Sequence, residues 1–291
     1  MIQSRRIRFF ALAGLTVMAL GGASAAADTK GLYKQLADQL SHALVTVKFV
    51  LKVQGPSGPQ EIEREFTALM IEKNGLVLCS SVQLGTSRIF RARGGQVTPT
   101  DIKVLIGDDT EGVPARLLTN DPELDLSWVQ IKKPDEQGYK FLDLSKSKVV
   151  TLGDRLLSAR RMDKFFDRAI VLNEGLLGGI TKKPRELLIP TASLEFGQTN
   201  IGMPVFAEDG SVVGVSVLQS PDPEDMDASS RGSADVLILP VAEVVKATEK
   251  AKTTAPAAEE EEDEASGDSD KSATKPDTND KSKSSHEESD E

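Results

Sequence analysis

The feature that most restricts the fold of this chain is a long series of short apolar segments separated by turn residues. In the first of them Val45, Val47 and Phe49 alternate with Thr46 and Lys48, which is the pattern of a half-buried strand. Further strands are predicted at 61–72, 76–79, 101–106, 113–118 and 126–131 in the first half, and at 149–150, 156–160, 168–175, 176–181, 186–190, 205–207, 211–217 and 236–239 in the second. Two runs of about six strands predict an all-β fold of two six-stranded antiparallel barrels, at about 43–135 and 140–240.

Helices are expected only at the two ends of this series. Leu32, Leu36 and Leu40 follow one another at four-residue spacing, which predicts an amphipathic helix over 30–41. Residues 241–251 have the same character, with Val244, Val245 and Ala247 on the inward face. The expected globular domain is therefore 28–252, with short N- and C-terminal helices.

The N-terminal residues 1–27 have the composition of a secretory signal peptide. Arg5, Arg6 and Arg8 form a basic region, an apolar run follows over 9–20, and Ala23-Ser24-Ala25 offers a cleavage site. The pattern predicts a protein outside the cytoplasm, periplasmic or secreted in a bacterium, with no membrane span once the signal is removed. An uncleaved anchor is the alternative, because the apolar stretch is nearly long enough to span a bilayer.

The C-terminal residues 253–291 are strongly acidic, with 14 acidic and 4 basic residues and an unbroken acidic run over 259–264. This segment has no aromatic residue and is predicted to be disordered, because it cannot bury enough apolar surface to offset the entropy of ordering. Two interpretations of this segment are open: a solubilising extension, or a tail that binds a cation or a partner. The rest of the chain is balanced in charge, which argues against nucleic-acid binding.

Few residues offer cofactor or metal chemistry. Cys79 is the single cysteine, so no internal disulfide can form, and no zinc-type cluster exists. The carboxylates of Asp222–Asp227 lack the glycine and terminal glutamate of a calcium loop. We therefore expect no metal and no cofactor.

The most informative motif lies at Gln198–Val217, where an Asp209-Gly210 turn joins two predicted strands. The preceding Gly/Asn segment, with Asn200, Gly202 and Pro204, resembles the nucleophile segment of trypsin-like serine proteases, in particular the HtrA/Deg branch. Residues 103–133 resemble the stretch of the same family that carries the catalytic aspartate. The resemblance covers nearly all of residues 30–250, in order.

The resemblance implies positions for a catalytic triad and an oxyanion hole. The aspartate falls on Asp125, but the histidine position holds Val82 and the serine position holds Ile201. The oxyanion-hole donors would be the backbone N–H groups of Thr199 and Ile201, where the family has glycine at the first position. A serine needs a base to take its proton, and the aspartate acts by orienting that base. The two histidines, His42 and His286, stand elsewhere in the sequence.

The resemblance thus implies a catalytically inactive protease homologue with a binding or scaffold role. In the family the strand after the nucleophile loop pairs with substrate. It corresponds to residues 214–218, namely Gly214, Val215, Ser216, Val217 and Leu218, and would pair with an extended or unfolded peptide. The sequence sets no oligomeric state.

The alternative is an active endopeptidase of HtrA/Deg type with non-standard catalytic residues. Its candidate nucleophiles are Cys79, or Ser80 or Ser81 with a lysine base. Cys79 is also readable as a small buried strand residue.

Overall fold

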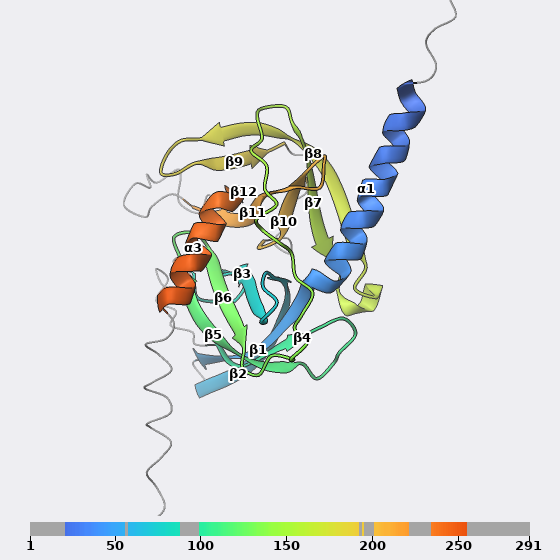
Figure 1. The fold of residues 1–291 in the computed structure, drawn as a ribbon. Coiled ribbons are helices and arrows are strands. Elements are labelled where there is room, and N and C mark those ends of the chain that lie inside the picture. Colours follow the sequence, from blue (N-terminus) through green and yellow to red (C-terminus); the bar gives the residue numbers. More distant parts are fainter. Residues whose placement is uncertain are drawn as a thin grey trace, which may run out of the picture. The chain divides into compact units, whose positions relative to one another are not determined.

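The computed structural model describes residues 21–55, 58–87, 99–191, 194, 201–220 and 234–254. Figure 1 shows two barrels, one above the other, with a helix at each end of the described chain. Barrel 1 consists of β1 (Leu44–Gly55), β2 (Gly58–Met70), β3 (Leu76–Ser80), β4 (Pro99–Leu105), β5 (Val113–Asp121) and β6 (Leu126–Ile131). Barrel 2 consists of β7 (Arg155–Arg161), β8 (Ile170–Thr181), β9 (Leu187–Pro190), β10 (Pro204–Ala207), β11 (Val212–Gln219) and β12 (Asp235–Pro240).

Both barrels are closed and antiparallel, which confirms the fold class expected from the sequence. The strand orders are β1-β2-β3-β6-β5-β4 and β10-β11-β12-β9-β8-β7. In β1 the alternation read from the sequence places Val45, Val47 and Phe49 in the interior of barrel 1, where all three are fully buried. Closure leaves no long unpaired sheet edge in either barrel.

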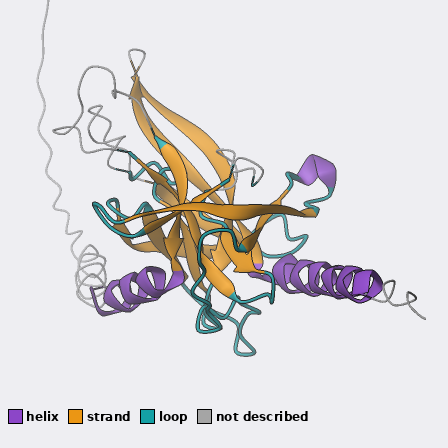
Figure 2. Ribbon diagram, turned by 90° about the horizontal axis from the view of Figure 1, so that it is seen from above, coloured by secondary structure: helices purple, strands orange, loops and turns teal. Residues whose placement is uncertain are grey.

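The helices α1 (Gly21–Ala43) and α3 (Val241–Thr254) lie on the periphery, on either side of the strands (Figure 2). The four-residue spacing predicted an amphipathic helix, and α1 confirms it: Leu36 and Leu40 are fully buried in a core shared by both barrels. Helix α3 is fixed to barrel 1 by a buried hydrogen bond from Trp128 Nε1 to Thr248 Oγ1, 3.0 Å long. The two barrels and both helices therefore share one core.

The strand predicted at 149–150 does not form. Val149 is 92% exposed, and the backbone N–H of Thr151 donates to the Asp154 carboxylate at 2.7 Å, so the chain turns instead of joining a ladder. The only pairing near this point among the described residues is an isolated bridge between Ser147 and Val212.

The strands predicted at 168–175 and 176–181 form a single strand, β8. The predicted boundary between them lies after Gly175. A Cβ on Gly175 would lie 2.8 Å from Cβ of Leu194, so this glycine allows close packing within a continuous strand.

Helix α1 begins at Gly21, nine residues before the predicted start at 30, and so includes the end of the predicted signal segment. Most of the predicted signal segment, residues 1–20, and the acidic tail from 255 lie outside the described residues. No helix in the described part of the chain is both long and apolar enough to cross a bilayer.

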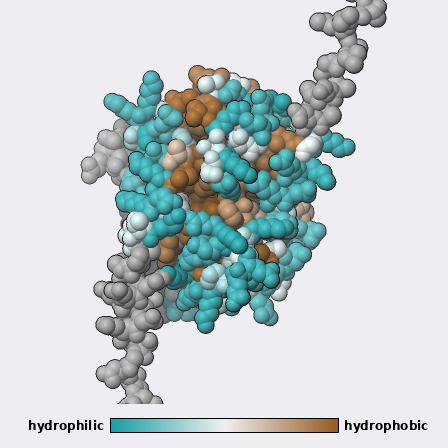
Figure 3. Space-filling model, viewed as in Figure 1, coloured by the Kyte–Doolittle hydropathy of each residue, from teal (hydrophilic) through white to brown (hydrophobic). Residues whose placement is uncertain are grey.

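Most of the face in Figure 3 is hydrophilic, and hydrophobic side chains show at the top of the view and down its middle. On β8 and β9, Leu176, Ile180 and Ile189 are each about two-fifths exposed, at 43%, 39% and 38%.

Candidate functional site

Asp125 lies in the turn between β5 and β6 and is almost completely buried, with 2% of its surface exposed. Its backbone is in the left-handed region, with φ of 58°, which is uncommon for a residue other than glycine. The carbonyl of Asp125 accepts from Ser81 N at 3.2 Å, which fixes the turn against the end of β3. A strained backbone conformation of this kind persists only where the surrounding structure holds the residue in place.

Three donors surround the Asp125 carboxylate. Ser80 Oγ lies 2.9 Å from each of its oxygens. The Val82 amide donates to Oδ1 at 2.9 Å, and the Leu218 amide donates to Oδ2 at 2.8 Å. The neighbouring hydroxyl, Ser81 Oγ, donates elsewhere, to the Leu126 carbonyl at 2.8 Å. Because Leu218 belongs to barrel 2, this carboxylate links the two barrels.

The electrostatics of Asp125 reflect two opposed effects. Burial is the larger and raises the pKa of the carboxyl from 3.8 to about 6, while the hydrogen bonds from Leu218, Val82 and Ser80 work against it. Burial therefore destabilises the ionised carboxylate near neutral pH, and the three hydrogen bonds offset part of that cost.

Val82, which the resemblance assigns to the histidine position, lies two residues after the end of β3 and is half-buried. Its amide donates to Asp125, but its isopropyl group can neither donate nor accept a proton. Asp125 orients no base at this position.

Ile201, at the serine position, is buried with 1% exposure. The next residue, Gly202, has φ of 84°, and a Cβ there would lie 3.1 Å from Ser80 N. Its amide donates to the Ser216 carbonyl at 2.7 Å. The chain at 201–202 therefore passes close against the end of β3, beside the segment that carries Val82. Thr199, the other oxyanion-hole position, lies outside the described residues.

The predicted peptide-binding strand 214–218 is part of β11 and is paired on both sides over most of its length. One edge pairs with β12 throughout. On the other edge Gly214 pairs with Val205, and Ser216 N donates to the Met203 carbonyl at 2.9 Å. Only past Ser216 does this edge leave β10. There Leu218 N binds Asp125, and the Leu218 carbonyl accepts from its neighbour Gln219 Nε2 at 3.2 Å.

The alternative nucleophiles are buried. Cys79 is fully buried, as read from the sequence, and burial raises the pKa of its thiol far above the usual range. Ser80 and Ser81 are each 0% exposed, and their hydroxyls bind Asp125 and Leu126. None of the hydrogen bonds of these two hydroxyls within the described residues involves a lysine.

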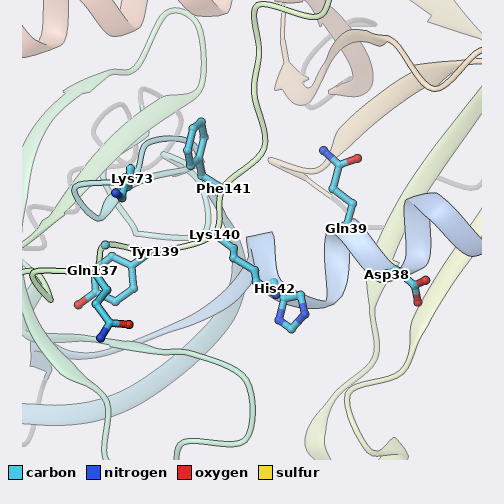
Figure 4. A pocket seen from close by; sticks show the side chains of 9 residues that line it. Asp38, Gln39, His42, Lys73, Gln137, Tyr139, Lys140 and Phe141 are labelled. Carbon is cyan, nitrogen blue, oxygen red and sulfur yellow. The ribbon is translucent and has the colours of Figure 1, made fainter.

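A cavity of about 730 Å³ lies elsewhere, between the last turns of α1 and the segment that follows barrel 1 (Figure 4). It is lined by Asp38, Gln39, His42, Lys73, Gln137, Gly138, Tyr139, Lys140 and Phe141. His42 therefore belongs to a different surface from Asp125, as expected, while His286 lies outside the described residues. No group of three or more His, Cys, Asp or Glu side chains in the described ranges is placed to hold a metal ion.

Two solved structures are similar to this chain, and the second of them, with a TM-score above 0.5, supports the fold. The MamO protease domain from Magnetospirillum magneticum, in its apo form, is 17% identical, with 68% of this chain and 94% of that chain covered and a TM-score of 0.42. Deg5 is 15% identical, with 75% of this chain and 92% of that chain covered and a TM-score of 0.51. A search of curated proteins found no match.

The sequence profile of the trypsin-like peptidase domain matches residues 67–215, from the end of β2 into β11 and so across both barrels. This match spans half of the chain and agrees with the two closed barrels. The chain belongs to the family of trypsin-like peptidase domains.

Proposed function

We propose that this protein is a catalytically inactive member of its family that binds extended peptides or unfolded protein segments outside the cytoplasm. One observation carries the first half of this proposal: the Asp125 carboxylate is occupied by Ser80 Oγ and by the amides of Val82 and Leu218. In an active triad a carboxylate orients an imidazole, which then takes the proton of the nucleophile. Here the imidazole and the hydroxyl are replaced by the side chains of Val82 and Ile201.

A substitute mechanism through Ser80 is unfavourable. Its hydroxyl is bound to Asp125, so an acid–base pair exists, but Ser80 is fully buried at the end of β3. A nucleophile must come within about 3–3.5 Å of the scissile carbonyl, and no substrate reaches a hydroxyl in that position. The retained aspartate therefore serves the structure by joining the barrels.

Hydrolysis of unfolded casein by the purified chain tests this first half. We expect no turnover above that of a heat-denatured sample, and no change on Asp125→Asn or Ser80→Ala substitution. Turnover that one of these substitutions abolishes would instead establish the alternative, an active endopeptidase with non-standard catalytic residues.

The second half of the proposal concerns the end of β11. The Leu218 carbonyl is held only by the side chain of its neighbour Gln219 within the described residues, and an incoming peptide N–H can displace that amide. Main-chain pairing at a strand end gives affinity without any catalytic residue. The half-buried isopropyl group of Val82, whose amide shares the Asp125 carboxylate with that of Leu218, favours apolar residues in such a peptide.

An N-methyl scan of an unstructured apolar hexapeptide tests strand pairing directly by isothermal titration. Methylation removes one peptide N–H at a time, so we expect affinity to fall roughly fivefold at alternate positions and to stay unchanged between them, as single lost hydrogen bonds predict. Uniform affinity along the scan, or no binding by any peptide, contradicts strand pairing.

The proposed location rests on the basic and apolar pattern of residues 1–27. Fusion of alkaline phosphatase after residue 254, in a bacterial host, should give activity that is lost when residues 1–27 are deleted. Equal activity without these residues contradicts export.

A further inference from the structure

Among the described residues, two side-chain donor atoms in barrel 2 are buried without a hydrogen-bond partner, Nε of Arg160 and Nδ2 of Asn173. Buried polar groups in folded proteins are nearly always paired, so such donors are candidates for binding an acceptor from outside the chain. The hydrogen bond that Arg160 does make joins Nη1 to Met162 Sδ at 3.1 Å. A thioether is a weak acceptor, so the guanidinium remains poorly satisfied.

The two donors share one face of the β7–β8 hairpin. Ser158 on β7 pairs with Asn173 on β8, and Arg160 lies two residues beyond Ser158. Side chains two residues apart on a strand, and those of paired residues, point to the same face. Leu156 and Leu177, in the same alternation, pack in the interior of barrel 2. Arg160 and Asn173 therefore face inward at one end of that barrel.

This end of the barrel borders the former nucleophile position. Strand β7 also pairs with β10, with Ser158 opposite Val205. Since the two strands are antiparallel, Arg160 lies toward the residues that precede β10, and these include Ile201 and Gly202. The unpaired donors thus lie on the barrel 2 side of the segment that approaches Asp125.

Arg160 differs from the neighbouring arginines in having no oxygen acceptor among the described residues, since its one hydrogen bond goes to the Met162 sulfur. Arg155 forms an ion pair with Glu174. Arg161 donates to the backbone carbonyls of Leu44 and Gly107, and Arg168 also donates to Gly107. Arginine stays protonated at any ordinary pH, and a half-buried cation without a counter-charge is stabilised by an anionic acceptor. No ion pair of Arg160 exists among the described residues.

We propose that Arg160 and Asn173 bind a carboxylate of the extended peptide, and this rests on the proposed peptide-binding function. A guanidinium presents its N–H groups in a fork that matches the two oxygens of a planar carboxylate. The Asn173 amide adds a neutral donor beside it. The carboxylate belongs either to the peptide's C-terminus or to an aspartate or glutamate side chain, and both present the same two oxygens.

Four versions of one apolar hexapeptide separate these sources in titrations with the purified chain. One has a free C-terminus, one is C-terminally amidated, one is amidated with an internal Glu, and one is amidated with Gln in its place. We expect the better acidic peptide to bind roughly tenfold more tightly than its neutral match, as a charge-assisted hydrogen bond predicts. Arg160→Gln should reduce that ratio to about one while leaving the affinity of the neutral peptide unchanged.

Matched variants guard against an effect of misfolding. Lys164→Gln removes a cation from the exposed tip of the same hairpin and should preserve the tenfold preference. Arg160→Lys keeps the positive charge but loses the forked N–H groups, so it should keep only part of the preference for acidic peptides. If Arg160→Gln does not fold, Asn173→Ala provides the same comparison. Equal binding of acidic and neutral peptides by the unmodified chain overturns the inference while leaving peptide binding itself intact.

An assay without peptides makes the inference testable even if peptide binding fails. In ¹H–¹⁵N spectra, sodium acetate should shift the Arg160 Nε–H and Asn173 Nδ2–H resonances, while sodium chloride at equal ionic strength should not. These acetate shifts should be absent in Arg160→Gln. Identical responses to the two salts mean that the pair has no carboxylate preference, and the proposed site is then wrong.

Discussion

Replacing Asp125 by asparagine should remove a pH dependence from the stability of this protein. Burial raises the pKa of Asp125 from 3.8 to about 6 in the folded state. A folded pKa above the unfolded one means that the native state holds its proton more tightly. The stabilisation is therefore complete below about pH 3.8 and is lost as the pH rises through 6. Between pH 7.5 and pH 4.5 the linkage amounts to about 2 kcal/mol in favour of the native state.

The asparagine variant lacks this titration but keeps nearly the same shape. Its amide nitrogen faces one of the donors from Ser80, Val82 or Leu218. This mismatch should cost about 1–3 kcal/mol of stability, and that cost does not itself depend on pH. Other carboxylates titrate alike in both proteins and cancel in the difference. The difference in unfolding free energy between the two proteins should thus grow by about 2 kcal/mol on acidification from pH 7.5 to 4.5.

Urea unfolding followed by tryptophan fluorescence measures this difference. Trp128 is the single tryptophan and is 1% exposed, so its emission reports the loss of the shared core. Parallel pH profiles for the two proteins would refute the reasoning. A difference that shrinks on acidification would show that the three donors outweigh burial and hold the pKa below its ordinary value.

Three further predictions follow from single contacts. Gly202→Ala should destabilise the protein by about 1–3 kcal/mol in the same assay, because φ is 84° and the new Cβ is crowded. Gly153→Ala is the matched control, with φ of 88° and open space around the new Cβ, and should cost about 1 kcal/mol. Thr248→Val leaves the buried Trp128 Nε1 without an acceptor and should cost about 1–3 kcal/mol, whereas an unchanged midpoint argues against that bond. Cys79 should react with Ellman's reagent only on unfolding, since it is fully buried and burial raises its pKa; rapid reaction of the native protein contradicts this.

The barrels could be predicted from the sequence because strand alternation and turn residues are local signals. Val45, Val47 and Phe49 determine the inner face of β1 without reference to any distant residue. Gly175 shows the limit of such signals. The close approach of Leu194, which requires a glycine there within a strand, depends on a contact 19 residues away that no local pattern reveals.

In the candidate site a motif can assign a position, but it cannot show which partners meet across the fold. Motif spacing assigns the aspartate position to Asp125, and its donor Ser80 lies two residues before Val82, the assigned histidine position. No sequence pattern indicates that the amide of Leu218, 93 residues away, donates to Asp125. The same holds for Arg160 and Asn173, since an unpaired donor is recognised only when all its neighbours are known.

The central claim is that this trypsin-like domain has no activated serine, and intact-mass spectrometry after treatment with a fluorophosphonate probe tests it most directly. Such probes form a covalent bond with serines that a neighbouring base has activated. We predict an unchanged mass for the native chain under conditions that fully label trypsin. A single added probe, lost on substitution of one serine, would contradict the account and establish an active endopeptidase.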